Sequence, residues 1–436
     1  MDEKPSLFNR IFALRYLFLW GNVTLFVVFG AVLVKDQVRG WKDYQVEFKK
    51  RELARTQENV KNAKTDDEKT RAADELKAAQ RMPMEIRQIV APDFNAVDRC
   101  ATCHMGFDPL GNPSLSTDYK EHPYKATPGT AAQAIHLAHN VEKFGCTVCH
   151  GGQGIATEVK AAHGEVEHWE SPMMKGVLLQ ASCAKCHDNL ADLKVNGVVY
   201  ASEIIRAKQL VRQHGCIGCH QIGGEGGPIS VDLRDETSIK PLSRIDFAYT
   251  GLPHEQWTLA NWIKVHLTKD PAQLVPGDPH GDFNTEPISP SGMPPFILSD
   301  ADANAITAYI LSLNRSKILP QYLRPAPPVA EVVSSNPVEH GHQVYEKFGC
   351  AACHGPEARG GIRNYNYQWG GTPNLRRSVS TFTRDEIREK ISDGVAFVAR
   401  NDPHGPNPPL YMPAWKAKIK GQELEDLITY LQSLRD

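Results

Sequence analysis

The sequence predicts a mainly α-helical protein with much irregular loop, and three observations predict this class. An uncharged apolar run lies near the N-terminus, a stretch rich in Lys, Glu, Arg and Ala follows it, and two similar segments occupy residues 200–314 and 337–436. Glycine and proline are plentiful, at 33 and 30 residues of 436, which suits a chain with long loops. A chain of this length exceeds a single core, so we expect several structural units.

Residues 17–34 read LFLWGNVTLFVVFGAVLV and contain no charged side chain. A helix over this run spans roughly 27 Å at about 1.5 Å per residue, which is just enough for a bilayer core. Trp20 and Trp41 lie towards its two ends, where membrane interfaces favour tryptophan. A cleaved signal peptide is the alternative, but the run is long for one and no A-x-A site follows it. We expect an uncleaved transmembrane anchor within residues 1–40.

Residues 41–95 predict a charged helical stalk. Val46, Leu53 and Val60 recur every seven residues without a matching second stripe. The segment Thr65-Asp-Asp-Glu68 is a capping box that should restart a helix, and Pro83 should end it. The expected state is a solvated stalk, and the alternative is a helix pair that packs on a partner.

The pattern Cys-x-x-Cys-His occurs five times and uses all 10 cysteines. This spacing attaches haem covalently, because the two thiols add to the vinyl groups and the adjacent histidine binds iron. Zinc knuckles or redox dithiols are the alternative, but every pair is followed by His and no cysteine is left over. We therefore expect five covalently bound haem c groups. Their attachment residues are Cys100, Cys103 and His104; Cys146, Cys149 and His150; Cys183, Cys186 and His187; Cys216, Cys219 and His220; Cys350, Cys353 and His354.

Residues 96–195 contain three of these Cys-x-x-Cys-His motifs, which we call haem phrases, in loop-like sequence with little periodicity. Three haems in so short a stretch must pack close together, as rapid haem-to-haem electron transfer requires. We expect a compact triheme region here.

The two similar segments predict an internal repeat. Each has an amphipathic run, a haem phrase, a proline loop, a Met-Pro pair at Met293 or Met412, and a closing helix that carries Tyr309 or Tyr430. We place the two domains at residues 196–320 and 337–436. Residues 321–336 form a Pro-rich linker that should be extended and fairly stiff, and that would let the last domain move.

The repeat resembles the class I cytochrome c domain, used twice, over about half of the chain. The resemblance implies the axial pairs His220/Met293 and His354/Met412, and the soft thioether raises the potential. It also implies that the carbonyls of Pro228 and Pro373 accept the Nδ1 hydrogen of the proximal histidine. Competitors for the position of Met293 lie in the insertion before it: His254, His266 and His280.

Residues 85–190 resemble bacterial membrane-anchored multihaem cytochromes, on the sequences around the first three phrases. Such proteins often accompany a cytochrome b and a Rieske protein in quinol-oxidising complexes. No Met-Pro loop with class I surroundings occurs here, although Met173 and Met174 follow a proline, so histidine is the expected sixth ligand. The candidates for these three distal positions are His122, His139, His163 and His168, with His136 as a fifth.

The combined resemblance implies an electron-transfer subunit rather than a catalyst. Haem c attachment takes place outside the bacterial cytoplasm, so the bulk of the chain is expected on the periplasmic side of the inner membrane. The expected partners are the membrane, cytochrome b/Rieske-type subunits and a soluble periplasmic acceptor. A net charge of -2 gives no general basic field for nucleic acid. The alternatives are a stand-alone quinol dehydrogenase, a subunit of alternative complex III, and a multihaem reductase of a small oxyanion.

Overall fold

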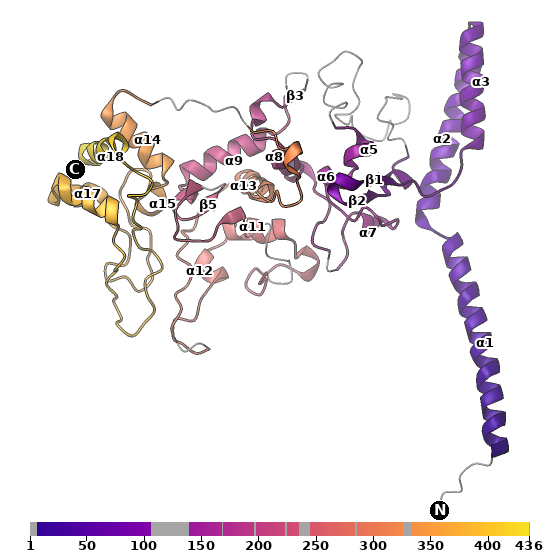
Figure 1. The fold of residues 1–436 in the computed structure, drawn as a ribbon, viewed down its shortest axis with the longest axis horizontal. Helices are drawn as coiled ribbons and strands as arrows, with labels where there is room; N and C mark the ends of the chain where they lie inside the picture. Colours follow the sequence, from indigo (N-terminus) through magenta and orange to yellow (C-terminus); the bar gives the residue numbers. More distant parts are fainter. Residues whose placement is uncertain are drawn as a thin grey trace, which may run out of the picture.

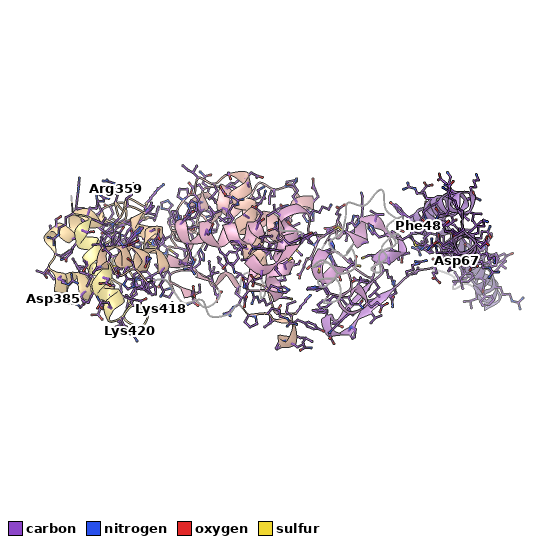
Figure 2. The ribbon with its side chains drawn as sticks, turned by 90° about the horizontal axis from the view of Figure 1, so that it is seen from above. Phe48, Asp67, Arg359, Asp385, Lys418 and Lys420 are labelled. Carbon is purple, nitrogen blue, oxygen red and sulfur yellow. The ribbon has the colours of Figure 1, made fainter. Side chains whose placement is uncertain are left out.

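The computed structural model describes residues 7–105, 139–167, 169–195, 198–222, 225–234, 245–283, 286–325 and 333–435. It is mostly helical, as the sequence predicts, and the chain forms a row of small units (Figure 1). Seen from above, Phe48 and Asp67 mark one end of the row and Arg359 and Asp385 mark the other (Figure 2). The row runs sideways from the junction of α1 and α2 (Figure 1).

Helix α1 (Leu7–Gln37) contains the apolar run and is longer than the predicted 17–34. Among the described residues, one helical stretch is long and apolar enough to cross a membrane, with a mean hydropathy of 2.2 over its best window. None of that window is buried by the rest of the chain, so its apolar side chains face outward. That exposure suits a lipid environment.

Helices α2 (Gly40–Asn62) and α3 (Asp66–Arg81) pack against each other as a hairpin. The predicted capping box is confirmed: Thr65 and Glu68 exchange side-chain and backbone hydrogen bonds, and α3 ends before Pro83. The stalk thus contains two helices that pack on each other, which neither the expected solvated stalk nor the alternative pair on a partner specified. Its buried face does not follow Val46 and Val60, which stay exposed, but residues such as Gln45, Glu52 and Thr56.

The region around the first three phrases consists of short elements, as its irregular sequence predicts. Its small apolar core contains Ala91, Phe94, Phe144 and Tyr322, with the rings of Phe94 and Tyr322 4.8 Å apart. The elements are β1 (Ile89–Ala91) and β2 (Ala96–Asp98), which pair antiparallel, η1 (Pro92–Phe94), η2 (Cys100–Thr102), α5 (Val141–Phe144), α6 (Thr147–His150), α7 (Val159–Ala162), η3 (Gly176–Leu179), α8 (Gln180–Cys186), η4 (Leu190–Asp192), and the pair β3 (Lys194–Val195) and β4 (Val198–Val199).

The first repeat unit is built on α9 (Ser202–Gln213), α11 (Leu259–Thr268) and α13 (Asp300–Ser312). Helix α13 packs against both of the others, and Ala207, Ile263 and Ile306 lie in the shared core. The predicted lead-in and closing helices are thus both present. The remaining elements are η5 (Cys216–Gly218), β5 (Gln221–Ile222), β6 (Glu225–Gly226), η7 (His254–Gln256), α12 (Pro271–Leu274) and η8 (Pro320–Tyr322).

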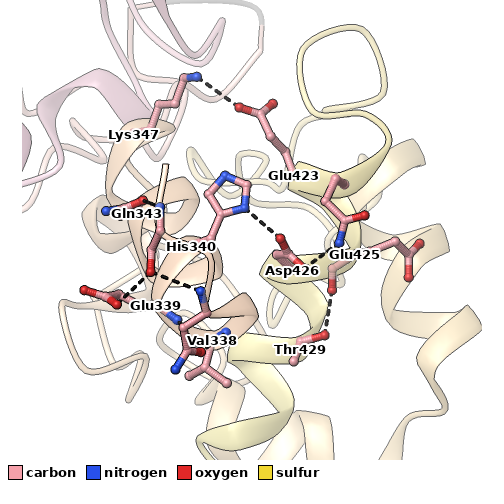
Figure 3. A network of polar contacts seen from close by, with 12 residues as sticks. Val338, Glu339, His340, Gln343, Lys347, Glu423, Glu425, Asp426 and Thr429 are labelled. Carbon is pink, nitrogen blue, oxygen red and sulfur yellow. Dashed lines mark hydrogen bonds and ion pairs between the residues drawn. The ribbon is translucent and has the colours of Figure 1, made fainter. Parts of the chain in front are cut away.

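The second repeat unit has the same plan, with α14 (Pro337–Lys347), α15 (Ala351–His354), α16 (Leu375–Thr381), α17 (Arg384–Asp393) and α18 (Gln422–Ser433). Helices α14 and α18 can cross closely because Gly341 has no side chain, and a Cβ atom there would overlap the carbonyl of Asp426. At this crossing the buried His340 ring lies 2.7 Å from a carboxylate oxygen of Asp426 (Figure 3).

Candidate haem attachment sites

All five Cys-x-x-Cys-His phrases adopt the same short helical turn. In each, the backbone N–H of the histidine donates to the carbonyl of the first cysteine, over 2.9 Å in the first two phrases and 3.0 Å in the other three. Residues at i, i+3 and i+4 of a helical turn share one face. The turn therefore presents two thiols and one imidazole together, as covalent haem attachment requires.

The last phrase lines a cavity of about 520 Å³ together with Met412 and apolar side chains such as Trp415 and Leu427. Nδ1 of His354 donates to the carbonyl of Pro373 over 3.2 Å, which confirms the predicted acceptor. That bond directs Nε2 away from the carbonyl. Burial lowers the pKa of His354, which favours the neutral imidazole that binds metals. The thiols, imidazole, thioether and apolar walls fit a haem c group.

The corresponding bond in the first repeat unit differs from the prediction. Nδ1 of His220 lies 3.0 Å from the carbonyl oxygen of Val231, so the predicted acceptor Pro228 is wrong. The reason is the register of the repeat: Val231-Asp-Leu-Arg234 matches Pro373-Asn-Leu-Arg376. Asp232 caps the N–H of Arg234 at 2.8 Å as Asn374 caps that of Arg376 at 3.0 Å. The shared Leu-Arg after an Asx residue was the signal for this alignment.

Met293 packs against the core of the first repeat unit together with Cys216 of its haem phrase. Two competing histidines, His254 and His280, are exposed. The third, His266, stacks on Trp262 with ring centroids 4.0 Å apart, and its Nδ1 lies 2.8 Å from the carbonyl of the same residue. The described geometry therefore favours Met293 as the distal ligand of the fourth haem.

Two predicted distal histidines lie opposite proximal histidines of the first region. The ring centroids of His104 and His163 are 6.5 Å apart, and those of His139 and His187 are 5.9 Å apart. Imidazoles bind first-row metals at about 2.0–2.1 Å, so two axial rings on one iron place their centroids roughly 6.3 Å apart. Both pairs fit one iron between the rings. The candidates His122, His136 and His168 lie outside the described residues.

Neighbouring phrases of the first region touch each other. The carboxylate of Asp98, two residues before the first phrase, accepts hydrogen bonds from the N–H groups of Cys146 and Thr147 in the second. The Sγ atoms of Cys100 and Cys146 lie within hydrogen-bond distance of each other. Ser182, beside the third phrase, donates to the carbonyl of Cys149 over 2.5 Å. Phrases one, two and three are therefore consecutive neighbours in space.

The third phrase joins the first repeat unit. Helix α8, which carries Cys183 and Cys186, packs on α13 and α9. Cys183 and Tyr309 pack on one apolar cluster with Ile204 and Ala308, and Tyr309 also packs on the core that contains Cys216. Tyr309 thus lies between the third and fourth sites.

The fourth and fifth phrases pack directly on one another. Gly218 and Gly349 are in backbone contact, so that a methyl group on either would overlap the other residue. The thiols of Cys219 and Cys353 form a hydrogen bond that raises the pKa of Cys219. The loops that carry the two methionines also meet, where Ser289 donates to the carbonyl of Asn407 over 2.6 Å. The two cytochrome c domains are therefore in contact in this structure, and the expected movement of the last domain stays a prediction.

The first phrase is held by the helix that follows the apolar segment. The buried side-chain amide of Gln45 donates to the carbonyls of Glu85 at 2.7 Å and Thr102 at 3.0 Å. The hydroxyl of Thr102 accepts from the N–H of Arg87 and donates to its carbonyl. Gln45 lies only eight residues beyond the end of α1 at Gln37, so the first haem site adjoins the apolar helix.

Comparison with known proteins identifies the repeat. Residues 204–314 and 338–435 match the family model "Cytochrome c". Both segments are cytochrome c domains. These domains imply covalently bound haem c and a role in electron transfer, so the chain is a multihaem c-type cytochrome. The prediction of two cytochrome c domains is confirmed, and their assignment to class I stays a prediction.

Two curated relatives are subunits of oxidase complexes by name. The chain is 26% identical over 272 residues to "Cbb3-type cytochrome c oxidase subunit FixP" of Sinorhizobium medicae, covering 59% of this chain and 73% of that protein. It is 26% identical over 222 residues to subunit FixPc of Rhizobium leguminosarum bv. viciae, covering 50% of this chain and 57% of that protein. No solved structure matches the chain significantly.

Proposed function

We propose that this cytochrome carries electrons from a membrane quinol-oxidising complex of the cytochrome b/Rieske type to a periplasmic acceptor. The observation that carries the proposal is the row of haem phrases: the first three are consecutive neighbours, Tyr309 lies between the third and fourth sites, and the fourth and fifth pack on one another. Haem c, when bound, exchanges one electron at its iron. The chain's own part is to hold successive groups close together and to set the potential of each.

The ligand types give the row a direction. The bis-histidine pairs His104/His163 and His139/His187 favour a low potential, whereas Met293 and Met412 favour ferrous iron and a high potential. By elimination, the second iron takes its distal ligand from His122, His136 or His168. Electrons therefore move downhill from the first region to the second cytochrome c domain.

The anchor gives the row an entry. Helix α1 crosses the inner membrane once, with the remainder on the periplasmic side. Gln45 of α2, the helix that follows α1, donates a hydrogen bond to Thr102 of the first haem phrase. Entry at the first haem is therefore closest to a membrane donor, and exit at the fifth haem is farthest from the anchor (Figure 1).

The similarity to cbb3-type oxidase subunits favours a second candidate function. In that case the chain delivers its electrons to the catalytic subunit of a membrane oxidase. The site chemistry is the same and only the acceptor differs.

Gentle purification of the full chain from its own membranes, followed by identification of co-purifying subunits, tests both functions. Cytochrome b and a Rieske protein are expected, and quinol-driven haem reduction should stop when the cytochrome b quinol site is inhibited. An oxidase catalytic subunit in their place would support the second candidate. Reduction of the isolated chain by quinol at an undiminished rate would instead identify a stand-alone quinol dehydrogenase.

A further inference from the structure

Asp98 is a buried carboxylate at the end of β2, with 0% of its surface exposed. Its Oδ2 accepts from the N–H of Cys146 at 2.5 Å and of Thr147 at 3.0 Å. Its Oδ1 is buried without a hydrogen-bond partner in the part of the chain that the structure describes. Gly145 and Gly154 enclose the two oxygens so tightly that a methyl group on either glycine would overlap them.

The carboxylate lies where the first two haem sites meet. It precedes Cys100 by two residues, and it binds the backbone at Cys146, whose thiol contacts that of Cys100. No Lys or Arg of the described ranges forms an ion pair with it.

Structural need alone does not explain a carboxylate at this position. An asparagine would offer one carbonyl oxygen to the same two N–H groups without a buried charge. Burying a charged oxygen without a partner is costly. An unsatisfied buried polar atom in a native structure calls for an explanation, and a redox role is one such explanation.

We propose that Asp98 is an electrostatic positioning residue that clasps the first two haem phrases and lowers the reduction potentials of both haems. Reduction adds an electron at each iron, and a fixed negative charge in a low-dielectric interior disfavours that addition. The charge thus keeps the entry end of the row lowest in potential. The inference rests on the proposed haem sites of the first two phrases and on no particular donor or acceptor.

Asp98→Asn in the full membrane-bound protein tests the proposal by potentiometric titration of all haems. The two lowest-potential steps should rise, at least one by a tenfold change in the reduction equilibrium, which is about 59 mV for one electron. The steps of the two cytochrome c domains should not move. Low-spin signals in electron paramagnetic resonance should be unchanged, because no axial ligand is altered.

Glu158→Gln is the matched control. Glu158 is exposed, and it follows the segment whose Gly154 and Ile155 carbonyls accept hydrogen bonds from Arg99, beside the first phrase. Water and salt screen an exposed charge, so its removal should shift the potentials less than a third as much and the shift should vanish at high salt. The Asp98→Asn shift should persist at high salt.

Unchanged low-potential steps in an Asp98→Asn protein with its full haem content would overturn the proposal. Asp98→Ser, which keeps an oxygen acceptor in less volume, serves if the Asn variant fails to assemble. Loss of the first two haems in both neutral variants would assign Asp98 to assembly alone and overturn the electrostatic role. Failure of the partner identification above would leave these potential shifts unaffected, so the two proposals fail separately.

Discussion

The two cytochrome c domains and the N-terminal region around the first three phrases hold haem by different means. In the second domain, Val344, Trp415, Ile428 and other side chains form a large apolar core behind the phrase. In the N-terminal region the described core amounts to Ala91, Phe94, Phe144 and Tyr322, and the phrases are tied to each other by Asp98 and Ser182. A small core cannot fix a fold by apolar burial alone.

The difference teaches where the cofactor belongs in the folding of each part. In a cytochrome c domain, helix pairs such as α14 and α18 pack within the domain and do not depend on the haem of the neighbouring domain. In the N-terminal region the first two phrases are joined through Asp98, and the second contacts Ser182 beside the third. We therefore expect the haems to supply the missing core of this region, as structural metals do in small domains.

Removing one attachment site should expose this difference most strongly. Replacing Cys146 and Cys149 by Ala removes the central site of the N-terminal region, and we expect loss of more than one haem. Replacing Cys350 and Cys353 by Ala should cost one haem, because the first cytochrome c domain has its own core. Intact mass after acid-acetone extraction counts the haems that remain. A loss of one haem in both variants would show that the N-terminal sites fold independently.

Met412→His converts the last site to the ligand type of the N-terminal region. Loss of the thioether removes its preference for ferrous iron, so the potential should fall by on the order of 0.1–0.3 V, within the ≈ 0.8 V range open to axial ligands. Redox titration should lose one high-potential step, and re-oxidation by the acceptor should slow sharply. Reduction of the first three haems should proceed at the parent rate. Re-oxidation at the parent rate would show that the second domain is not the exit.

Gly349→Ala should weaken the contact between the two cytochrome c domains. Each domain has its own core and should stay folded, whereas the sites of the N-terminal region should not tolerate such a separation. Gly349 has φ of 67° and contacts Gly218 of the fourth phrase. Overpacking of this kind costs about 1–3 kcal/mol, and here the cost should weaken the interface between the two domains. Electron transfer from the fourth to the fifth haem, followed by flash-induced absorbance changes, should slow several-fold.

Gly355→Ala is the control for that substitution. Gly355 also has a positive φ, of 74°, but a methyl group there meets nothing within 4 Å. It should lower the stability of the second domain by its backbone strain and leave inter-haem transfer unchanged. Equal slowing in both variants would refute a role for the glycine contact.

The sequence was sufficient for every feature whose signal is local. Five haem phrases, the repeat, its lead-in and closing helices, the cap at Thr65 and the acceptor Pro373 are all visible in short stretches of residues. The axial candidates His139 and His163 could be named but not assigned, because their partners His187 and His104 are far away in the sequence.

What the sequence could not provide depends on packing between distant segments. Nothing around Asp98 shows that its carboxylate caps residues 146 and 147, and nothing around Gly349 shows that Gly218 faces it. The two helices of the stalk were predicted but not the packing of α2 on α3, because the buried residues of α2 include Gln45, Glu52 and Thr56 and form no apolar stripe. The Val231 acceptor was missed because Pro228 offered a more familiar but wrong alignment.

The smallest effect compares the same local motif in two settings. Thr65 caps α3 of the hairpin and Thr383 caps α17 of the second cytochrome c domain, each in a capping box with a glutamate three residues later. Replacing such a cap by Ala costs about 0.5–2 kcal/mol. Helix α17 is also bound to α18, because Arg384 and Arg388 both pair with Glu425.

The two substitutions should therefore destabilise different extents of the structure, a whole domain for Thr383→Ala and a local segment for Thr65→Ala. Thr383→Ala should lower the melting temperature of the second domain, because α17 unfolds together with α18 and its core. Thr65→Ala should leave every haem domain at its parent melting temperature and raise amide hydrogen exchange only in α3 and the adjoining part of α2, since partial opening of the hairpin need not disturb Gln45 near the start of α2. If Thr65→Ala also loosens the amides of residues 100–104, the hairpin and the first haem site unfold as one unit. The first haem site would then depend on the helix pair, as the fifth depends on the core of its own domain. The N-terminal region and the second cytochrome c domain would then differ less in how they stabilise a haem site than their sequences imply.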